Sequence, residues 1–139
     1  MSGKCDLKRH VSSIHCIVGY FTSRKTTTCL GMLTGLRKYL PDSRVNYIKP
    51  VGQKHVTIDG VKVDKDVVLF KKWFNLTARE PAMSPVVVAA GFSRDYIDGK
   101  YSREHLVKLI DNAVEEVSHQ SDLIVVEGTG HTGVGKFKE

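Results

Sequence analysis

The chain reads Gly19-Tyr20-Phe21-Thr22-Ser23-Arg24-Lys25-Thr26 between an apolar run, residues 14–18, and an amphipathic stretch, residues 25–40. This is the phosphate-binding loop pattern G-x-x-x-x-G-K-[ST], except that Arg24 stands where the pattern has its second glycine. A strand, a tight loop and a helix are the context this pattern needs, because backbone N–H groups and the helix N-terminus then face an anion. The stretch therefore predicts a nucleotide-binding loop, with Lys25 at the terminal phosphates and the Thr26 hydroxyl at Mg²⁺. The candidate cofactor-binding residues are Gly19, Ser23, Arg24, Lys25, Thr26 and Thr27.

Arg24 leaves two interpretations of this loop open. Glycine occupies that position in the pattern because the backbone turns tightly and approaches the phosphates closely. Either the loop follows a different path in this chain, or the Arg24 guanidinium itself binds phosphate.

Composition narrows the class of protein. The 139 residues carry a formal net charge of +6, which suits an anionic ligand, and their basic residues are scattered rather than gathered in a stripe, so we expect no nucleic-acid partner. No apolar run approaches the roughly 20 residues of a membrane span, so we expect no membrane partner either. The polar start, residues 1–10, has no apolar signal core, and three cysteines without C-x-x-C spacing are typical of reduced thiols. We therefore expect a cytoplasmic protein.

Strand and helix patterns alternate along the chain. Apolar periodicity predicts helices over residues 25–40 and 103–118, and strands over residues 14–18, 44–48 and 122–126. Asp59-Gly60 predicts a hairpin over residues 56–63, and a short helix follows over residues 64–74. Asp64 is the expected N-cap of that helix. This order predicts an α/β fold: an open, mostly parallel sheet with helices on both faces.

The expected domain covers residues 13–135, with tails at residues 1–12 and 136–139. Sheets of this kind usually have five or more strands, so we expect a domain that lacks its C-terminal strands. The apolar strand at residues 122–126 is then an uncovered edge, and we expect a homodimer or a partner chain to cover it.

Three polar loops follow strands of this predicted sheet: residues 19–26, 49–52 and 127–130. Ligands of open α/β sheets bind at the carboxyl ends of the strands, so these loops are expected to form one crevice. A second pattern of the form G-x-x-x-x-G-K, at residues 130–136, lacks the Ser or Thr and is not expected to bind phosphate.

Several motifs together resemble the dethiobiotin synthetase-like P-loop proteins. The motifs are Lys25-Thr26, IKPVG at residues 48–52, VDKD at residues 63–66, Ser84-Pro85 and VVEGTGH at residues 125–131. That group also includes cobyrinic acid amide synthases and the N-terminal domain of some phosphate acetyltransferases. The stretch GFSRDYIDG, residues 91–99, resembles an uncharacterised branch of the same superfamily.

The resemblance implies ATP and Mg²⁺ as cofactors and assigns roles to individual residues. Lys25 and Lys49 would be catalytic: Lys25 would bind the β- and γ-phosphates, and Lys49 a substrate carboxylate or the phosphoryl group passed to it. Thr26, Asp66 and Glu127 would hold or orient the metal. The implied substrate-binding residues are Lys49, Arg94, Gly128 and Thr129. This assignment of roles to cationic and metal-binding residues is physically reasonable, because phosphoryl transfer depends on positioning the phosphate and on neutralising its charge.

Other interpretations of single residues stay open. Asp66 also fits a helix-dipole residue, and Arg94 also fits a local ion-pair turn with Asp95 and Asp98. Glu127 follows four apolar residues, where a carboxylate without a partner would be unfavourable.

The leading hypothesis is a Mg-ATP-binding domain related to ATP-dependent carboxylate-activating ligases, acting on a small carboxylate substrate. The alternatives are a nucleotide-sensing regulatory module without catalysis, and a truncated paralogue without a tight ligand. Whether the chain is an enzyme stays open.

Overall fold

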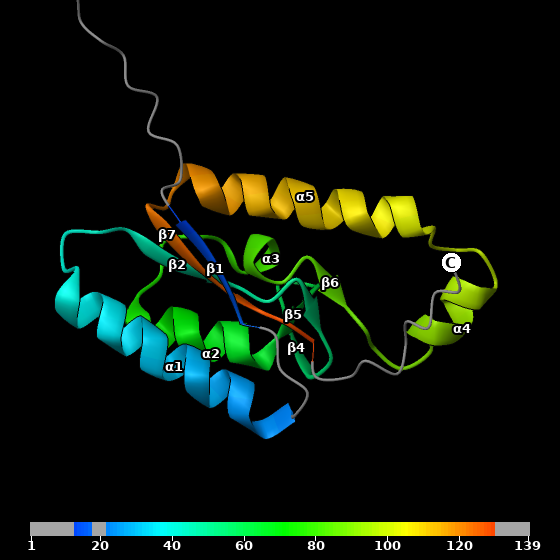
Figure 1. Cartoon of the computed structure of the whole chain (residues 1–139). Helices are drawn as coiled ribbons and strands as arrows, with labels where there is room; N and C mark the ends of the chain where they lie inside the picture. The colour runs from blue at the N-terminus through cyan, green and yellow to red at the C-terminus, as the bar shows by residue number, and fades with distance from the viewer. Residues whose placement is uncertain (1–12, 18–21, 130–139) are drawn as a thin grey trace, which may run out of the picture.

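The computed structural model describes residues 13–17 and 22–129, with side chains from residue 25 onward. A parallel sheet lies between two helical layers (Figure 1). Helices α1 (Thr22–Tyr39) and α2 (Lys65–Phe74) cover one face, and α5 (Arg103–His119) covers the other. The predicted fold class, an α/β P-loop NTPase-like domain, is confirmed.

The sheet has the strand order β1 (Ser13–Ile17), β7 (Leu123–Glu127), β2 (Val45–Ile48). Strand β7, the last one within the described residues, is therefore the central strand of this sheet, with Tyr47 of β2 paired to Val125. Ile124 and Val125 are fully buried. The expectation that this strand is an uncovered edge is wrong, because a parallel crossover inserts it between the two earlier strands. The homodimer or partner chain stays a prediction.

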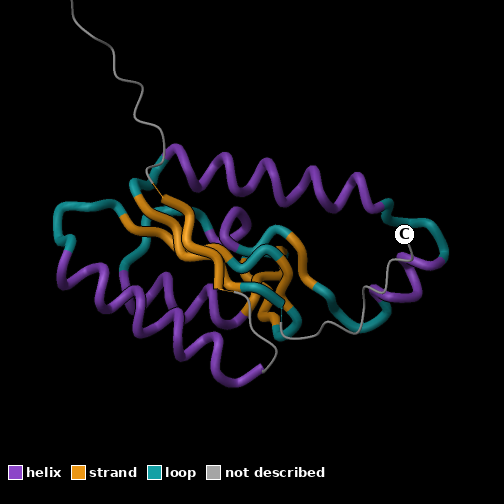
Figure 2. Tube along the Cα trace, in the orientation of Figure 1, coloured by secondary structure: helices purple, strands orange, loops and turns teal. Residues whose placement is uncertain are grey.

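Two short strand pairs form two further, separate two-stranded sheets. Strand β3 (Val51–Gly52) pairs in parallel with β6 (Val86–Val87), and β4 (His55–Ile58) forms an antiparallel hairpin with β5 (Val61–Asp64). Figure 2 shows all these strands gathered between the helices. The predicted hairpin is confirmed: Asp59 and Gly60 have φ of 48° and 79°, the positive values that a two-residue hairpin turn requires.

Helix α1 begins at Thr22, three residues earlier than predicted. The backbone of Arg24 therefore belongs to the first turn of a helix, which any L-residue can adopt. This explains how arginine can replace the glycine of the pattern: its backbone does not need the positive φ that glycine supplies.

Two short helices were not predicted: α3 (Glu80–Met83) and α4 (Phe92–Ile97). Neither is long enough to show a helical period in its sequence. Helix α2 begins where predicted, with the Asp64 carboxylate as its N-cap accepting from the Asp66 backbone N–H.

The core lies on both faces of the sheet. The Tyr47 ring meets Phe70 of α2 edge to face, with centroids 4.6 Å apart. Cys29 and Leu33 of α1 pack from the same side, while Ala113 and Val117 of α5 are also buried. Among the residues that the structure describes, no helix is long and apolar enough to cross a membrane. The expected tails and the pattern at residues 130–136 lie outside the described residues.

Candidate functional site

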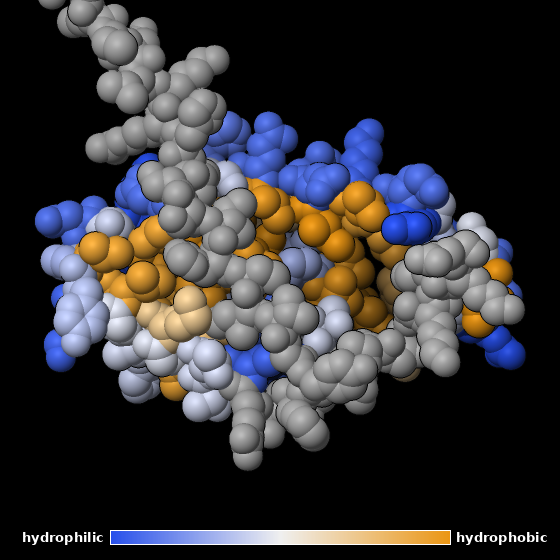
Figure 3. Space-filling view, viewed as in Figure 1, coloured by the Kyte–Doolittle hydropathy of each residue, from blue (hydrophilic) through white to orange (hydrophobic). Residues whose placement is uncertain are grey.

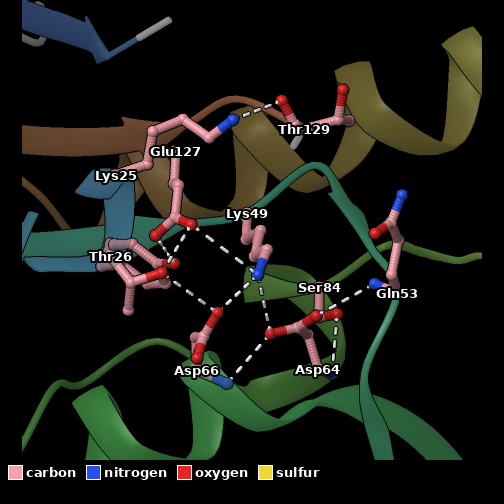
Figure 4. A network of polar contacts seen from close by, with 10 residues as sticks. Lys25, Thr26, Lys49, Gln53, Asp64, Asp66, Ser84, Glu127 and Thr129 are labelled. Carbon is pink, nitrogen blue, oxygen red and sulfur yellow. Dashed lines mark hydrogen bonds and ion pairs between the residues drawn. The ribbon is translucent and has the colours of Figure 1, made fainter. Parts of the chain in front are cut away.

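One polar network joins the start of α1 to the ends of β2, β5 and β7 (Figure 4). Lys25 and Thr26 come from α1, Lys49 directly follows β2, and Glu127 ends β7. The predicted convergence of the loops is confirmed for these residues, although up to about a hundred residues separate them in sequence.

Lys49 lies at the centre of three carboxylates. Its Nζ is 2.5 Å from Asp66 Oδ2, 3.2 Å from Asp64 Oδ1 and 3.7 Å from Glu127 Oε1. Burial opposes its charge, but the hydrogen bond to Asp66 and the neighbouring carboxylates outweigh burial, so the pKa of Lys49 is raised above 10.5. Three acidic groups around one ammonium leave a local excess of negative charge, which suits a second cation.

Glu127 is 2% exposed, and each of its oxygens has a partner. The Tyr47 hydroxyl donates to Oε2 at 2.7 Å, and the Thr26 hydroxyl lies 3.0 Å from Oε1. Tyr47 thus fixes the carboxylate so that Oε1 faces Thr26 and Lys49. The sequence analysis missed Tyr47; the available signal was a phenol in an apolar strand two residues before Lys49, since a buried Tyr hydroxyl usually finds a partner.

Asp64 connects the start of α2 to the chain that follows Lys49. Its carboxylate accepts from the backbone N–H groups of Asp66 at 2.9 Å and Gln53 at 3.1 Å, besides its contact with Lys49. Gly52 is required beside it, because a Cβ there would lie 2.5 Å from Asp64 Oδ2. From the sequence Asp64 was predicted only as the N-cap of a helix; the structure shows that it also contacts Lys49.

The three predicted metal residues lie together. Thr26 Oγ1 is 3.4 Å from Asp66 Oδ2 and 3.0 Å from Glu127 Oε1. Two neighbouring ligands of an octahedral Mg²⁺ with bonds of about 2.0–2.1 Å lie about 2.9 Å apart, so Thr26 and Glu127 fit that separation. Among the described residues, no group of three or more His, Cys, Asp or Glu could hold a metal ion by itself. Mg²⁺ is usually held by one or two carboxylates together with phosphates and water.

Lys25 is 4% exposed, and its ammonium donates to the Thr129 carbonyl at 2.7 Å. The predicted phosphate-binding lysine and one predicted substrate residue are therefore in contact across the site. Thr27 is exposed on α1, and Gly128 is half-buried directly after Glu127. The backbone of Ser23 and Arg24 is helical, and Gly19 lies outside the described residues.

Arg94 is not part of this network. It lies exposed on α4. The ion pair of this segment joins Asp95 to Lys100, with 2.5 Å between the charged atoms. Arg94 and Asp98 are linked by a backbone hydrogen bond from the Asp98 N–H to the Arg94 carbonyl.

A family comparison agrees with this geometry. Residues 22–139 match a family model described as an AAA domain. The chain belongs to this family. It is thus a P-loop NTPase-like domain of the dethiobiotin synthetase-like group, as the motifs indicated. Among curated proteins, none matches the sequence. The matched range of this P-loop domain contains the whole Lys25–Lys49–Glu127 network.

Proposed function

We propose that this P-loop domain binds Mg-ATP and uses it to activate the carboxylate of a small substrate. The observation that carries the proposal is the meeting of Thr26, Lys49 and Glu127 at one end of the parallel sheet, beside Lys25. The family supports a bound nucleotide. The carboxylate-activating reaction rests on the position of Lys49 and on the resemblance.

Each residue of the network has a defined task in this proposal. Lys25 would bind the β- and γ-phosphates in place of the Thr129 carbonyl, because an ammonium binds a phosphate oxygen more strongly than a neutral acceptor. Thr26 and Glu127 would hold Mg²⁺, and Asp66 would help to orient it. When bound, Mg-ATP supplies the phosphoryl group and neutralises the charge that develops on it.

Lys49 provides the link to the substrate. Without a metal its ammonium is held by Asp64, Asp66 and Glu127. Glu127 would hold a divalent cation through the same carboxylate oxygen that contacts Lys49, and the Lys49 ammonium would then be available for the substrate carboxylate. The raised pKa keeps this lysine protonated at neutral pH, as an anion-binding role requires.

Calorimetric titration with ATP, with and without Mg²⁺, tests nucleotide binding. Lys25→Ala is expected to weaken ATP binding by more than about tenfold, since one hydrogen bond to a charged group contributes about 1.5–3 kcal/mol. Lys38→Ala is the matched control, because Lys38 is exposed near the other end of α1. Equal affinity in wild type and Lys25→Ala would remove the loop from the proposal.

Phosphate release tests the reaction. Candidate carboxylates are added to the protein with Mg-ATP, and release that requires both protein and carboxylate supports a ligase. Tight Mg-ATP binding without release under any carboxylate would favour the nucleotide-sensing alternative.

A further inference from the structure

A cavity of about 280 Å³ lies beside the polar network, beneath the N-terminal half of α5. Figure 3 shows that the apolar surface is hollowed in this region. Most of its lining is apolar or aromatic: Pro85, Val86, Phe92, Tyr101, Leu106 and Leu109. Small-molecule sites usually measure about 300–1,000 Å³, so this cavity suits a small ligand or one part of it.

The cavity explains an irregularity in the amphipathic face of α5. Ala113 and Val117, in the C-terminal half of the helix, are buried against the sheet. Leu106 and Leu109 continue the same apolar stripe, but they line the cavity, and Leu109 is 37% exposed. An apolar helix face is therefore directed at a small space rather than at protein core.

Aromatic rings form another wall. Phe92 at the start of α4 stacks on Tyr101 before α5, with centroids 5.3 Å apart and an angle of 14° between the rings. Tyr101 is 36% exposed. Stacked rings give a flat apolar surface at little cost in side-chain entropy, which suits an aliphatic chain or a ring.

The cavity is lined by residues next to those that contact the Lys49 site: the Val86 backbone N–H donates to the carbonyl of Pro50, which follows Lys49, and Ser84, which precedes Pro85, accepts from the Asp64 backbone N–H. Val86 and Val87 line it, and they pair with Val51 and Gly52, which follow Lys49. Lys62 also lines it and lies two residues before Asp64 on β5, so the two side chains share a face about 7 Å apart. The Lys49 site and the cavity thus lie on neighbouring residues of the same pair of short strands.

Charge at the rim favours an anion. Lys62 and Asp95 are the charged residues of the lining, and Asp95 is paired with Lys100. Within the described part of the chain Lys62 has no ion-pair partner. The rim therefore offers one positive charge next to an apolar interior.

From this arrangement we infer that the cavity takes the hydrocarbon part of the substrate, an apolar monocarboxylate whose carboxylate lies at the mouth between Lys49 and Lys62. The inference rests on the proposed carboxylate activation and narrows its substrate to aliphatic or aromatic acids, as opposed to sugar acids or amino acids.

Titration of the ¹⁵N-labelled wild-type protein with acetate, hexanoate and gluconate tests this in buffer that contains Mg²⁺ but no nucleotide, because the metal would compete with Lys49 for its carboxylates. Each buried methylene improves affinity by up to about fourfold, so hexanoate is expected to bind at least about tenfold more tightly than acetate. Its shifts should centre on the amides of Val87 and Leu109. Equal affinities, shifts elsewhere or no binding by any acid would overturn the inference.

Two substitutions on α5 give a matched pair. Leu109→Asp places a charge in the cavity wall and is expected to weaken hexanoate binding by about tenfold. Val107→Asp, at an exposed position of the same helix outside this cavity, should change it by less than about twofold. Lys62→Gln should weaken binding of hexanoate, and Lys72→Gln on α2 should not. Equal effects within either pair would exclude the cavity as the site.

The nucleotide titration keeps the two proposals apart. If ATP binds with Mg²⁺ while hexanoate binds no better than acetate, the cavity inference fails and the proposed function stands. If hexanoate binds in the cavity but ATP does not bind, the proposed function fails, and with it the assignment of hexanoate as a model substrate.

Discussion

Tyr47→Phe separates the positioning of Glu127 from the packing of the core. Phenylalanine keeps the ring, which is fully buried and meets Phe70 edge to face at 4.6 Å. It removes only the hydroxyl that donates to Glu127 Oε2 at 2.7 Å. A hydrogen bond to a charged group contributes about 1.5–3 kcal/mol, and here its loss leaves a nearly buried carboxylate oxygen without that donor. We therefore expect the free energy of unfolding to fall by about 2 kcal/mol.

The same change acts on the metal. Without Tyr47 the carboxylate of Glu127 can rotate away from Thr26, and loss of such an outer partner usually lowers metal affinity about 10–100-fold. The ratio of ATP affinities with and without Mg²⁺, measured by calorimetry, should fall by at least about tenfold. Tyr39→Phe is the control, because Tyr39 is 76% exposed on α1. A Tyr47→Phe protein that loses stability but keeps its Mg²⁺ dependence would show that Tyr47 serves the core alone.

Three further predictions concern the network and its surroundings. Glu127→Gln keeps the shape of the side chain and removes its charge, so the Mg²⁺ dependence of ATP binding should fall while metal-free binding survives or improves; unchanged dependence in calorimetry would make Glu127 structural. Gly52→Ala forces a Cβ to within 2.5–2.9 Å of Asp64 and should lower the free energy of unfolding in urea by about 1–3 kcal/mol. Gly35→Ala on α1, where a Cβ meets nothing within 4 Å, should be neutral or stabilising, and equal effects would contradict the close approach. Burial, and then Glu127, raises the pKa of Cys29 from 9.0 to about 12, so between these values the unfolded thiol loses its proton and the folded one keeps it. The unfolded state then binds fewer protons, and the free energy of unfolding falls as pH rises above 9, by up to about 1.4 kcal/mol per pH unit. Between pH 8 and pH 10 the free energy of unfolding measured in urea should therefore fall less steeply for Cys29→Ala than for the wild type. Parallel pH dependences of the two proteins would refute this.

Local patterns in the sequence predicted the elements well where the cause is local. Asp59-Gly60 specifies a two-residue turn because both positions need positive φ. Asp64 caps α2 through a hydrogen bond to a backbone N–H two residues away. The predicted helix at residues 103–118 corresponds to α5, because its apolar period extends over several turns.

The candidate site was predicted in outline. Carboxyl ends of parallel strands meet at one edge, so Lys49 and Glu127 could be placed together from their positions after apolar runs. The contact between Thr26 and Glu127 agrees with the metal role that the resemblance implied. The roles of Arg94, Gly128 and Thr129 as substrate residues stay predictions.

The features that the sequence did not predict depend on contacts between segments far apart in sequence. No local pattern states that β7 lies between β1 and β2, and that order alone corrects the expected apolar edge. The hydrogen bond from Tyr47 to Glu127 joins residues 80 apart and exists only because β2 and β7 are neighbours. The sequence by itself determined which segments are helices or strands, and that the polar site residues lie at the carboxyl ends of strands, because dihedral preferences and periodicity are local. Only the tertiary structure decided which strand is central and which side chain holds Glu127, because strand order is set by packing across the whole sheet.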